Sequence, residues 1–72
     1  MTDIVLIMAE NIKQLRIKKG LTQKDICNKS GLIQSQFSRI ERGLVEPSIS
    51  TLDKLANVLE VSVSELFKIN KQ

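Results

Sequence analysis

Three glycines and one proline divide this chain at regular intervals. Gly20, Gly31, Gly43 and Pro47 leave segments of helical length between them, and no segment alternates apolar and polar residues as a strand does. The 72 residues provide room for one hydrophobic core. The sequence therefore predicts an all-α fold with one domain over residues 1–72.

Apolar spacing and capping side chains predict five helices. Helix starts are expected where a hydroxyl or carboxylate can accept from the first free backbone amides. The predicted helices start within residues 3–8, at 23, at 34, after 47 and after 62. Their predicted N-caps are Thr2 or Asp3, Thr22 in a capping box with Asp25, Ser48 or Ser50, and Ser62.

The second and third predicted helices are separated only by residues 31–33. So short a link makes two helices cross steeply, which is the geometry of a helix-turn-helix unit. Ile26 and Cys27 are predicted to face inward from the second helix, and Phe37 and Ile40 from the third. Their burial would leave the polar residues of the third helix exposed.

The scarcity of His and Cys excludes most kinds of catalytic and metal-binding site. The chain has no His and one Cys, so it cannot supply a zinc tetrad, a Ser-His-Asp triad or an internal disulfide. We therefore expect no enzyme, no metal and no cofactor. The six-residue apolar run Ile4–Ala9 is too short to cross a membrane and lacks the basic start of a signal peptide, so the expected location is the cytoplasm.

Positive charge is concentrated in the middle of the chain. Residues 10–43 hold eight Lys and Arg against three acidic residues, a net charge of +5, whereas the rest of the chain sums to −2. This asymmetry fits a surface that binds a polyanion, and equally a solvated helix face on which Lys provides solubility. Charge alone leaves both alternatives open.

The segment TQKDICNKSGLIQSQFSRIERG, residues 22–43, resembles the Cro/repressor (Xre-type) helix-turn-helix family, whose members read like L-T-Q-x-x-L-A-x-x-x-G-x-S-x-x-x-I-S-x-I-E-x-G. Pro47-Ser48 and the run 61–67 are similar to the fourth and fifth helices of that family. The resemblance implies a compact five-helix lambda-repressor-like fold, with a helix-turn-helix core at about 22–43 and dimerisation helices at about 48–69. It also implies a transcriptional regulator whose third helix enters the major groove of double-stranded DNA.

The resemblance assigns roles to polar residues of the second and third helices. Amide and guanidinium groups are suited to base edges, and cations or helix N-termini to phosphates. The residues implied to read bases are Gln34, Ser35 and Arg39, followed by Gln36 and Ser38. Those implied to contact phosphates are Gln23, Arg42, Lys24 and Gly43.

Other matched positions carry structural expectations. Arg16 and Glu41 match a pair that forms an ion pair in relatives, although two independent surface charges are the alternative. Cys27 stands where the family has a small Ala, so we expect a buried small side chain; a reactive or metal-binding thiol is the alternative. Ile33 replaces the usual Ser or Thr cap of the recognition helix, and residues 44–46 replace a loop that is often basic.

One helix-turn-helix unit covers about half an operator, so we expect a homodimer on a pseudo-palindromic site. Two apolar surfaces are candidates for the dimer contact: the run Ile4–Ile7, or the set Val58, Val61, Val63, Phe67 and Ile69, which the resemblance favours.

The chain starts with Met, and its length resembles that of free-standing repressors and restriction-modification controllers, which both activate and repress. RNA polymerase is then a further partner, and no small-molecule effector is expected. The alternative is a helix-turn-helix module or antitoxin that acts through a partner protein.

Overall fold

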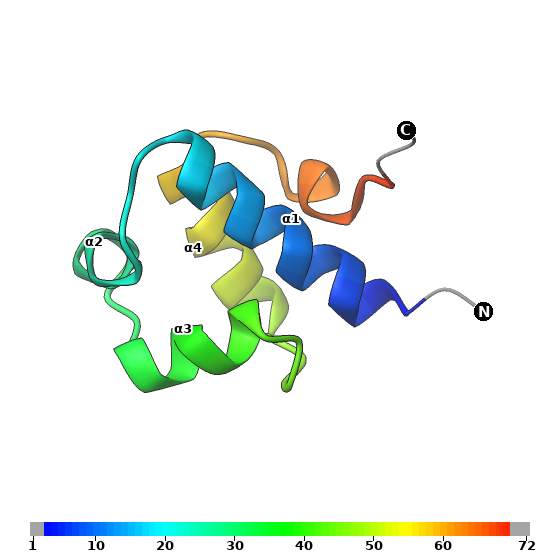
Figure 1. The fold of residues 1–72 in the computed structure, drawn as a ribbon, viewed down its shortest axis with the longest axis horizontal. Helices are drawn as coiled ribbons and strands as arrows, with labels where there is room; N and C mark the ends of the chain where they lie inside the picture. Colours follow the sequence, from blue (N-terminus) through cyan, green and yellow to red (C-terminus); the bar gives the residue numbers. More distant parts are fainter. Residues whose placement is uncertain (1–2, 70–72) are drawn as a thin grey trace.

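A computed structural model describes residues 3–69 of the chain, and these residues form four α-helices and one short 3-10 helix. The elements are α1 (Ile4–Lys18), α2 (Gln23–Ser30), α3 (Gln34–Glu41), α4 (Ile49–Leu59) and η1 (Val63–Phe67). Figure 1 shows α1 running across α4, with α3 below them and α2 at one end. The predicted all-α fold is confirmed.

Three of the predicted capping residues begin their helices as expected. The Asp3 carboxylate accepts from the amide of Val5 at 3.0 Å, at the start of α1. Thr22 and Asp25 form the predicted capping box at the start of α2, and the Ser48 hydroxyl accepts from the amide of Thr51 at 3.2 Å in α4. The alternative cap Thr2 lies outside the described residues.

The predicted fifth helix is wrong in type. Residues 63–67 form a 3-10 helix, in which the amide of Glu65 donates to the Ser62 carbonyl at 3.1 Å and that of Lys68 to the Glu65 carbonyl at 3.4 Å. Five residues are too few for several i to i−4 bonds, so the tighter i to i−3 pattern is favoured. Ser62 does not cap the element through its side chain; its hydroxyl pairs with that of Ser64 at 2.9 Å.

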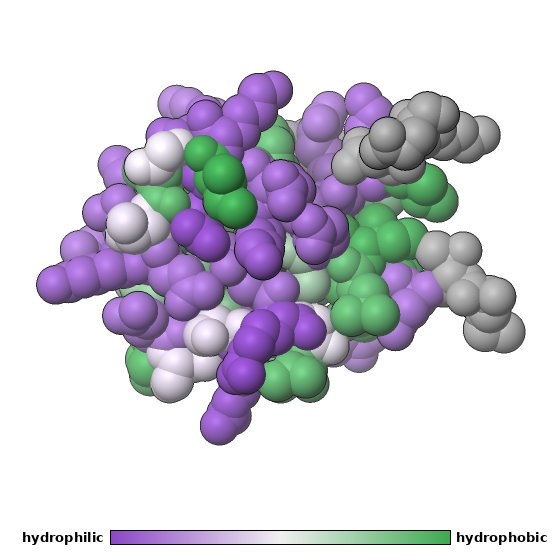
Figure 2. All heavy atoms as spheres, in the orientation of Figure 1, coloured by the Kyte–Doolittle hydropathy of each residue, from purple (hydrophilic) through white to green (hydrophobic). Residues whose placement is uncertain are grey.

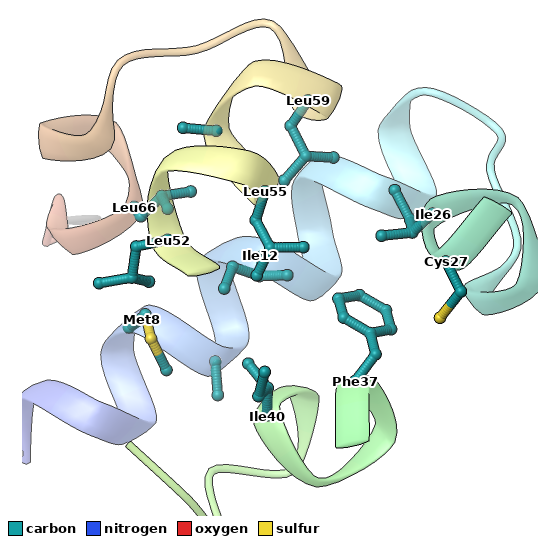
Figure 3. Close-up of a cluster of buried hydrophobic side chains, with 12 residues drawn as sticks. Met8, Ile12, Ile26, Cys27, Phe37, Ile40, Leu52, Leu55, Leu59 and Leu66 are labelled. Atoms are coloured by element: carbon teal, nitrogen blue, oxygen red, sulfur yellow. The ribbon is translucent and has the colours of Figure 1, made fainter. Parts of the chain in front are cut away.

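Every element contributes to one hydrophobic core (Figure 3). The ring of Phe37 points from α3 into the centre and is fully buried, as are Ile12 of α1 and Leu55 of α4. Removing such side chains from water is the main source of stability in a domain of this size. The buried apolar residues are Met8, Ala9, Ile12, Ile26, Cys27, Phe37, Ile40, Leu52, Leu55, Ala56, Leu59 and Leu66.

A buried polar side chain attaches the C-terminal segment to α1. The Asn11 side-chain amide donates to the carbonyl of Leu66 at 2.9 Å and to that of Lys68 at 2.8 Å. Asn11 is only 7% exposed, so these bonds form where water competes poorly. The segment after η1 is thereby held beside the first half of α1.

Candidate nucleic-acid interface

The turn between α2 and α3 determines how α3 is presented. Gly31 ends α2 in the left-handed conformation with φ of +80°, which side chains other than glycine adopt poorly. Its amide donates to the Cys27 carbonyl at 2.8 Å. After this turn Leu32 packs against the core and Ile33 is exposed, so α3 starts with its polar side outward.

The outer face of α3 carries most of the residues predicted to read bases. Phe37 and Ile40 are buried, as predicted. The opposite side of the helix exposes Gln34, Ser35, Gln36 and Arg39, while Ser38 is half-buried. The helix therefore presents amide, hydroxyl and guanidinium groups from a rigid base, and such groups can hydrogen-bond to base edges.

A groove of about 520 Å³ separates this face from the start of α4 and the loop before it. Ser35, Gln36 and Arg39 line one wall, whereas Gln34 and Ser38 are not part of it. The residues that line the groove are Ile33, Ser35, Gln36, Arg39, Ile40, Val45, Glu46, Pro47, Ser48 and Thr51.

A buried polar network fixes the three helices at this end. The Arg16 guanidinium donates through Nε to Oε2 of Glu41 at 2.5 Å and through Nη2 to Oε1 at 3.2 Å. Its Nη1 donates to the Leu21 carbonyl at 2.8 Å, and the Gln23 amide donates to Oε1 of Glu41 at 3.0 Å. Because the Glu41 side chain is only 3% exposed, the network links α1, α2 and α3 in a desolvated setting.

The bond from Gln23 to Glu41 was not predicted. Gln23 is predicted to contact a phosphate, whereas in the structure it is half-buried and its side-chain amide donates to Glu41. Residues 23 and 41 are eighteen positions apart, and a single Gln carries no pattern that identifies its partner. The pairing depends on how α2 and α3 cross.

The candidates for phosphate contact differ in accessibility. Lys24 and Arg42 are exposed at the ends of α2 and α3. The amide of Gly43 donates to the Ile40 carbonyl at 3.0 Å, and the next amide, of Leu44, donates to the Arg39 carbonyl at 3.0 Å. Both amides therefore already have an acceptor in the turn that ends α3.

Gly43 has a packing role. Its φ is +71°, and a Cβ built at this position would lie 2.5 Å from Cδ2 of Leu6. The first turn of α1 therefore rests on the backbone at the end of α3, and any larger residue would have to displace Leu6.

The environment of Cys27 favours a neutral thiol. Burial, with a smaller contribution from the negative charge of Glu41, raises the pKa of this thiol above its ordinary value. No group of three His, Cys, Asp or Glu side chains among residues 3–69 is arranged to hold a metal ion. The position matches the expected small buried side chain.

Only Ile69 of the second predicted dimer set lies beside the N-terminal run, whereas Val58 lies beside Lys19, Leu21 and Lys29. Val58, Val61, Val63 and Phe67 are partly used in packing against the chain's own core, whereas Ile69 is 60% exposed. A groove of about 300 Å³ brings Ile69 beside the N-terminal run, and Figure 2 shows hydrophobic atoms gathered where α1 begins. The residues lining this groove are Leu6, Ile7, Glu10, Asn11, Lys68 and Ile69.

Sequence comparison identifies the family. The helix-turn-helix family HTH_3 matches residues 12–66. The chain belongs to this family of DNA-binding transcriptional regulators. Because the family is not one of enzymes, the expectation of no enzymatic activity is confirmed, and so is the resemblance to Xre-type regulators. No helix in the described part of the chain is long and apolar enough to cross a membrane.

Two relatives differ in how much of their length is matched. The transcriptional regulator PuuR of Escherichia coli is 40% identical over 67 residues, which are 93% of this chain and 36% of PuuR. The regulator y4dJ of Sinorhizobium fredii is 41% identical over 64 residues, which are 89% of this chain and 83% of y4dJ. The chain thus spans about a third of PuuR and most of y4dJ.

Three solved structures share the fold. The controller protein C.AhdI of Aeromonas hydrophila has a TM-score of 0.84 and 33% identity, covering 88% of this chain and 96% of that one. The biofilm regulator SinR, solved in complex with DNA, has a TM-score of 0.80 and 40% identity, covering 85% of this chain and 98% of that one. The controller protein C.Esp1396I, solved as a tetramer on its 35-base-pair operator, has a TM-score of 0.79 and 30% identity, covering 94% of this chain and 100% of that one.

Proposed function

We propose that this chain is a sequence-specific transcriptional regulator that binds double-stranded DNA as a homodimer, with α3 in the major groove of each half of a pseudo-palindromic operator. The observation that carries the proposal is the outer face of α3, where four polar side chains stand exposed on a helix anchored by Phe37 and Ile40. Residues 1–72 then act as a single DNA-binding domain in the cytoplasm.

Each polar residue of α3 has a role that fits its chemistry. Arg39 offers two donors to O6 and N7 of guanine, and the amides of Gln34 and Gln36 pair with N6 and N7 of adenine. The hydroxyls of Ser35 and Ser38 can donate or accept. Phosphates are held by Lys24 and Arg42, and by the Gln23 amide proton that does not point to Glu41.

The homodimer is supported by the apolar end of the molecule. Ile4, Leu6 and Ile69 are each about half exposed or more, and one groove joins the last two. Apolar surface that is exposed in one chain is removed from water when two chains associate. The set Val58, Val61, Val63 and Phe67 is half-buried and packs against the core, so it offers less apolar surface to a second chain.

The biological role that we propose is control of a restriction-modification system, with activation at low occupancy and repression at high occupancy. Support comes from the likeness of the whole described fold to two controller proteins, one of them bound to its operator. Activation would require contact with RNA polymerase. In this role the concentration of the protein, rather than a small-molecule effector, sets the response.

A matched pair of arginine variants tests the roles. Binding sites are first selected by the wild-type protein from a random duplex library, and affinities are measured over a range of salt concentrations. Arg39→Ala is expected to lose discrimination at one base pair, about 1–3 kcal/mol, because a base contact is removed. Arg42→Ala is expected to weaken all sequences alike and to reduce the salt slope by about 1.

Two results would contradict the proposal. Identical specificity profiles for both variants would remove the distinction between base and phosphate contacts. If the wild-type protein has no affinity for duplex DNA even at low salt, the chain acts instead through a partner protein, as an interaction module or antitoxin.

A further inference from the structure

The side chain of Ile33 is exposed where the fold provides no reason for an apolar residue. Ile33 precedes the first residue of α3 and is 69% exposed, while its neighbour Leu32 packs on the core. At this N-cap position Ile33 makes no side-chain hydrogen bond to the helix. A Ser or Thr there would accept from a free amide and stabilise the helix by about 1 kcal/mol.

The position of Ile33 places it among the residues of the DNA-facing surface. Ile33 lines the same groove as Ser35, Gln36 and Arg39. The N-terminal residues of a recognition helix approach base edges most closely, and Ile33 stands directly before them. The isoleucine side chain has no donor or acceptor, and the apolar group that a major groove offers it is the 5-methyl group of thymine.

We infer that Ile33 determines specificity by packing against the 5-methyl group of one thymine in each half of the operator. This inference rests on the proposed function, because it requires α3 to enter the major groove. Ile33 then adds an apolar contact to the hydrogen bonds made by Gln34 and Arg39. With isoleucine at position 33 the helix lacks the capping hydrogen bond that a Ser or Thr hydroxyl would make, and the protein gains a preference for thymine.

The experiment removes the 5-methyl group of thymine and the side chain of Ile33 separately. A duplex selected from a random library by the wild-type protein is resynthesised with each thymine replaced in turn by deoxyuridine, which lacks only the 5-methyl group. Wild-type binding is expected to weaken about fourfold at one thymine per half-site, the factor for exposing one methyl-sized group. Placing 5-bromodeoxyuridine there, with bromine where the methyl was, should restore the affinity.

Ile33→Ser is expected to bind the thymine and deoxyuridine duplexes equally at that position. The variant restores a capping hydroxyl, so it should fold at least as stably as the wild type. The matched control is Ile49→Ser at the start of α4, where the isoleucine is 81% exposed and does not line the groove. This control should keep the fourfold sensitivity.

The outcomes separate this inference from the proposed function. If specific duplexes are selected but no deoxyuridine substitution weakens binding, or if Ile33→Ser retains the sensitivity, the assignment of Ile33 is overturned while the regulator proposal stands. If no specific duplex is selected at all, both are overturned.

Discussion

The two ends of the molecule hold their exposed side chains in place by different means. At the α2–α3 end, charged and amide groups of Arg16, Glu41 and Gln23 bond to one another beneath a polar surface. At the other end, one amide from Asn11 bonds to two backbone carbonyls beneath an apolar surface that includes Ile69. The polar surface thus lies over a network of several side chains, whereas the segment that carries Ile69 is held by the side chain of Asn11.

This difference predicts unequal consequences of mutation. A network whose members satisfy each other fails when one member is lost, because the others keep their polar groups in a desolvated site. A single residue that bonds to backbone carbonyls affects mainly the segment it holds. The α2–α3 end should therefore be the costlier one to disturb.

The largest effect is expected from Glu41→Ala. Removal of the carboxylate leaves the guanidinium of Arg16, whose side chain is 14% exposed, without its partner. A stranded buried charge costs about 3–5 kcal/mol, a large share of the stability of a small domain. The free energy of unfolding measured in urea should fall by that amount.

The matched control is the double variant Arg16→Met/Glu41→Leu, which removes both charges and keeps apolar volume. It should lose much less stability than Glu41→Ala, because no unpaired charge remains. Equal losses for the two proteins would show that the pair behaves as two independent surface charges.

A smaller and more local effect is expected from Asn11→Ala. The carbonyls of Leu66 and Lys68 lose their donor, and an unsatisfied buried acceptor costs about 1–3 kcal/mol. Amide hydrogen exchange should accelerate around η1 while α3 remains protected. Weaker dimerisation should follow, because Ile69 is then no longer held beside Leu6.

Gln14→Ala provides the comparison for Asn11. Gln14 lies one turn further along α1, is exposed, and bonds only to Glu10 among the interactions observed, so its loss should change stability by less than about 0.5 kcal/mol. Accelerated exchange across α2 and α3 in Asn11→Ala would contradict the separation of the two ends.

Local signals in the sequence predicted the helix starts well. Thr22, Asp25 and Ser48 act within three residues of their own position, so their roles depend little on the rest of the fold. The same reasoning was wrong for Ser62, because five residues form a 3-10 helix with different amide positions. The outward face of α3 followed from the burial of Phe37 and Ile40.

Contacts between distant residues could not be predicted from the same signals. Asn11 bonds to residues 55 and 57 positions away, and nothing in the residues around it indicates a buried amide. The meeting of the N-terminal run with Ile69 also depends on how the helices pack, so the sequence offered the two surfaces only as alternatives. The engaged amide of Gly43 was missed because it depends on how α3 ends.

The smallest expected effect concerns the thiol of Cys27, at the α2–α3 end. Its pKa is raised in the folded protein, so folding favours the protonated form. The corresponding stability is complete below the pKa of an unfolded thiol, about 8.5, and is lost as the pH rises above it, because the unfolded chain then releases its proton first.

Subtracting the pH dependence of Cys27→Ala should isolate this decline, since the other titrating groups are common to both proteins. At pH 8 the folded thiol should also react with a disulfide reagent more slowly than the thiol of the chain unfolded in urea. A fast reaction in the folded protein, or a stability that rises relative to Cys27→Ala above pH 9, would indicate a stabilised thiolate. A stabilised thiolate would mean that the network beside it supplies positive charge to Cys27, contrary to the negative influence that Glu41 exerts in this structure.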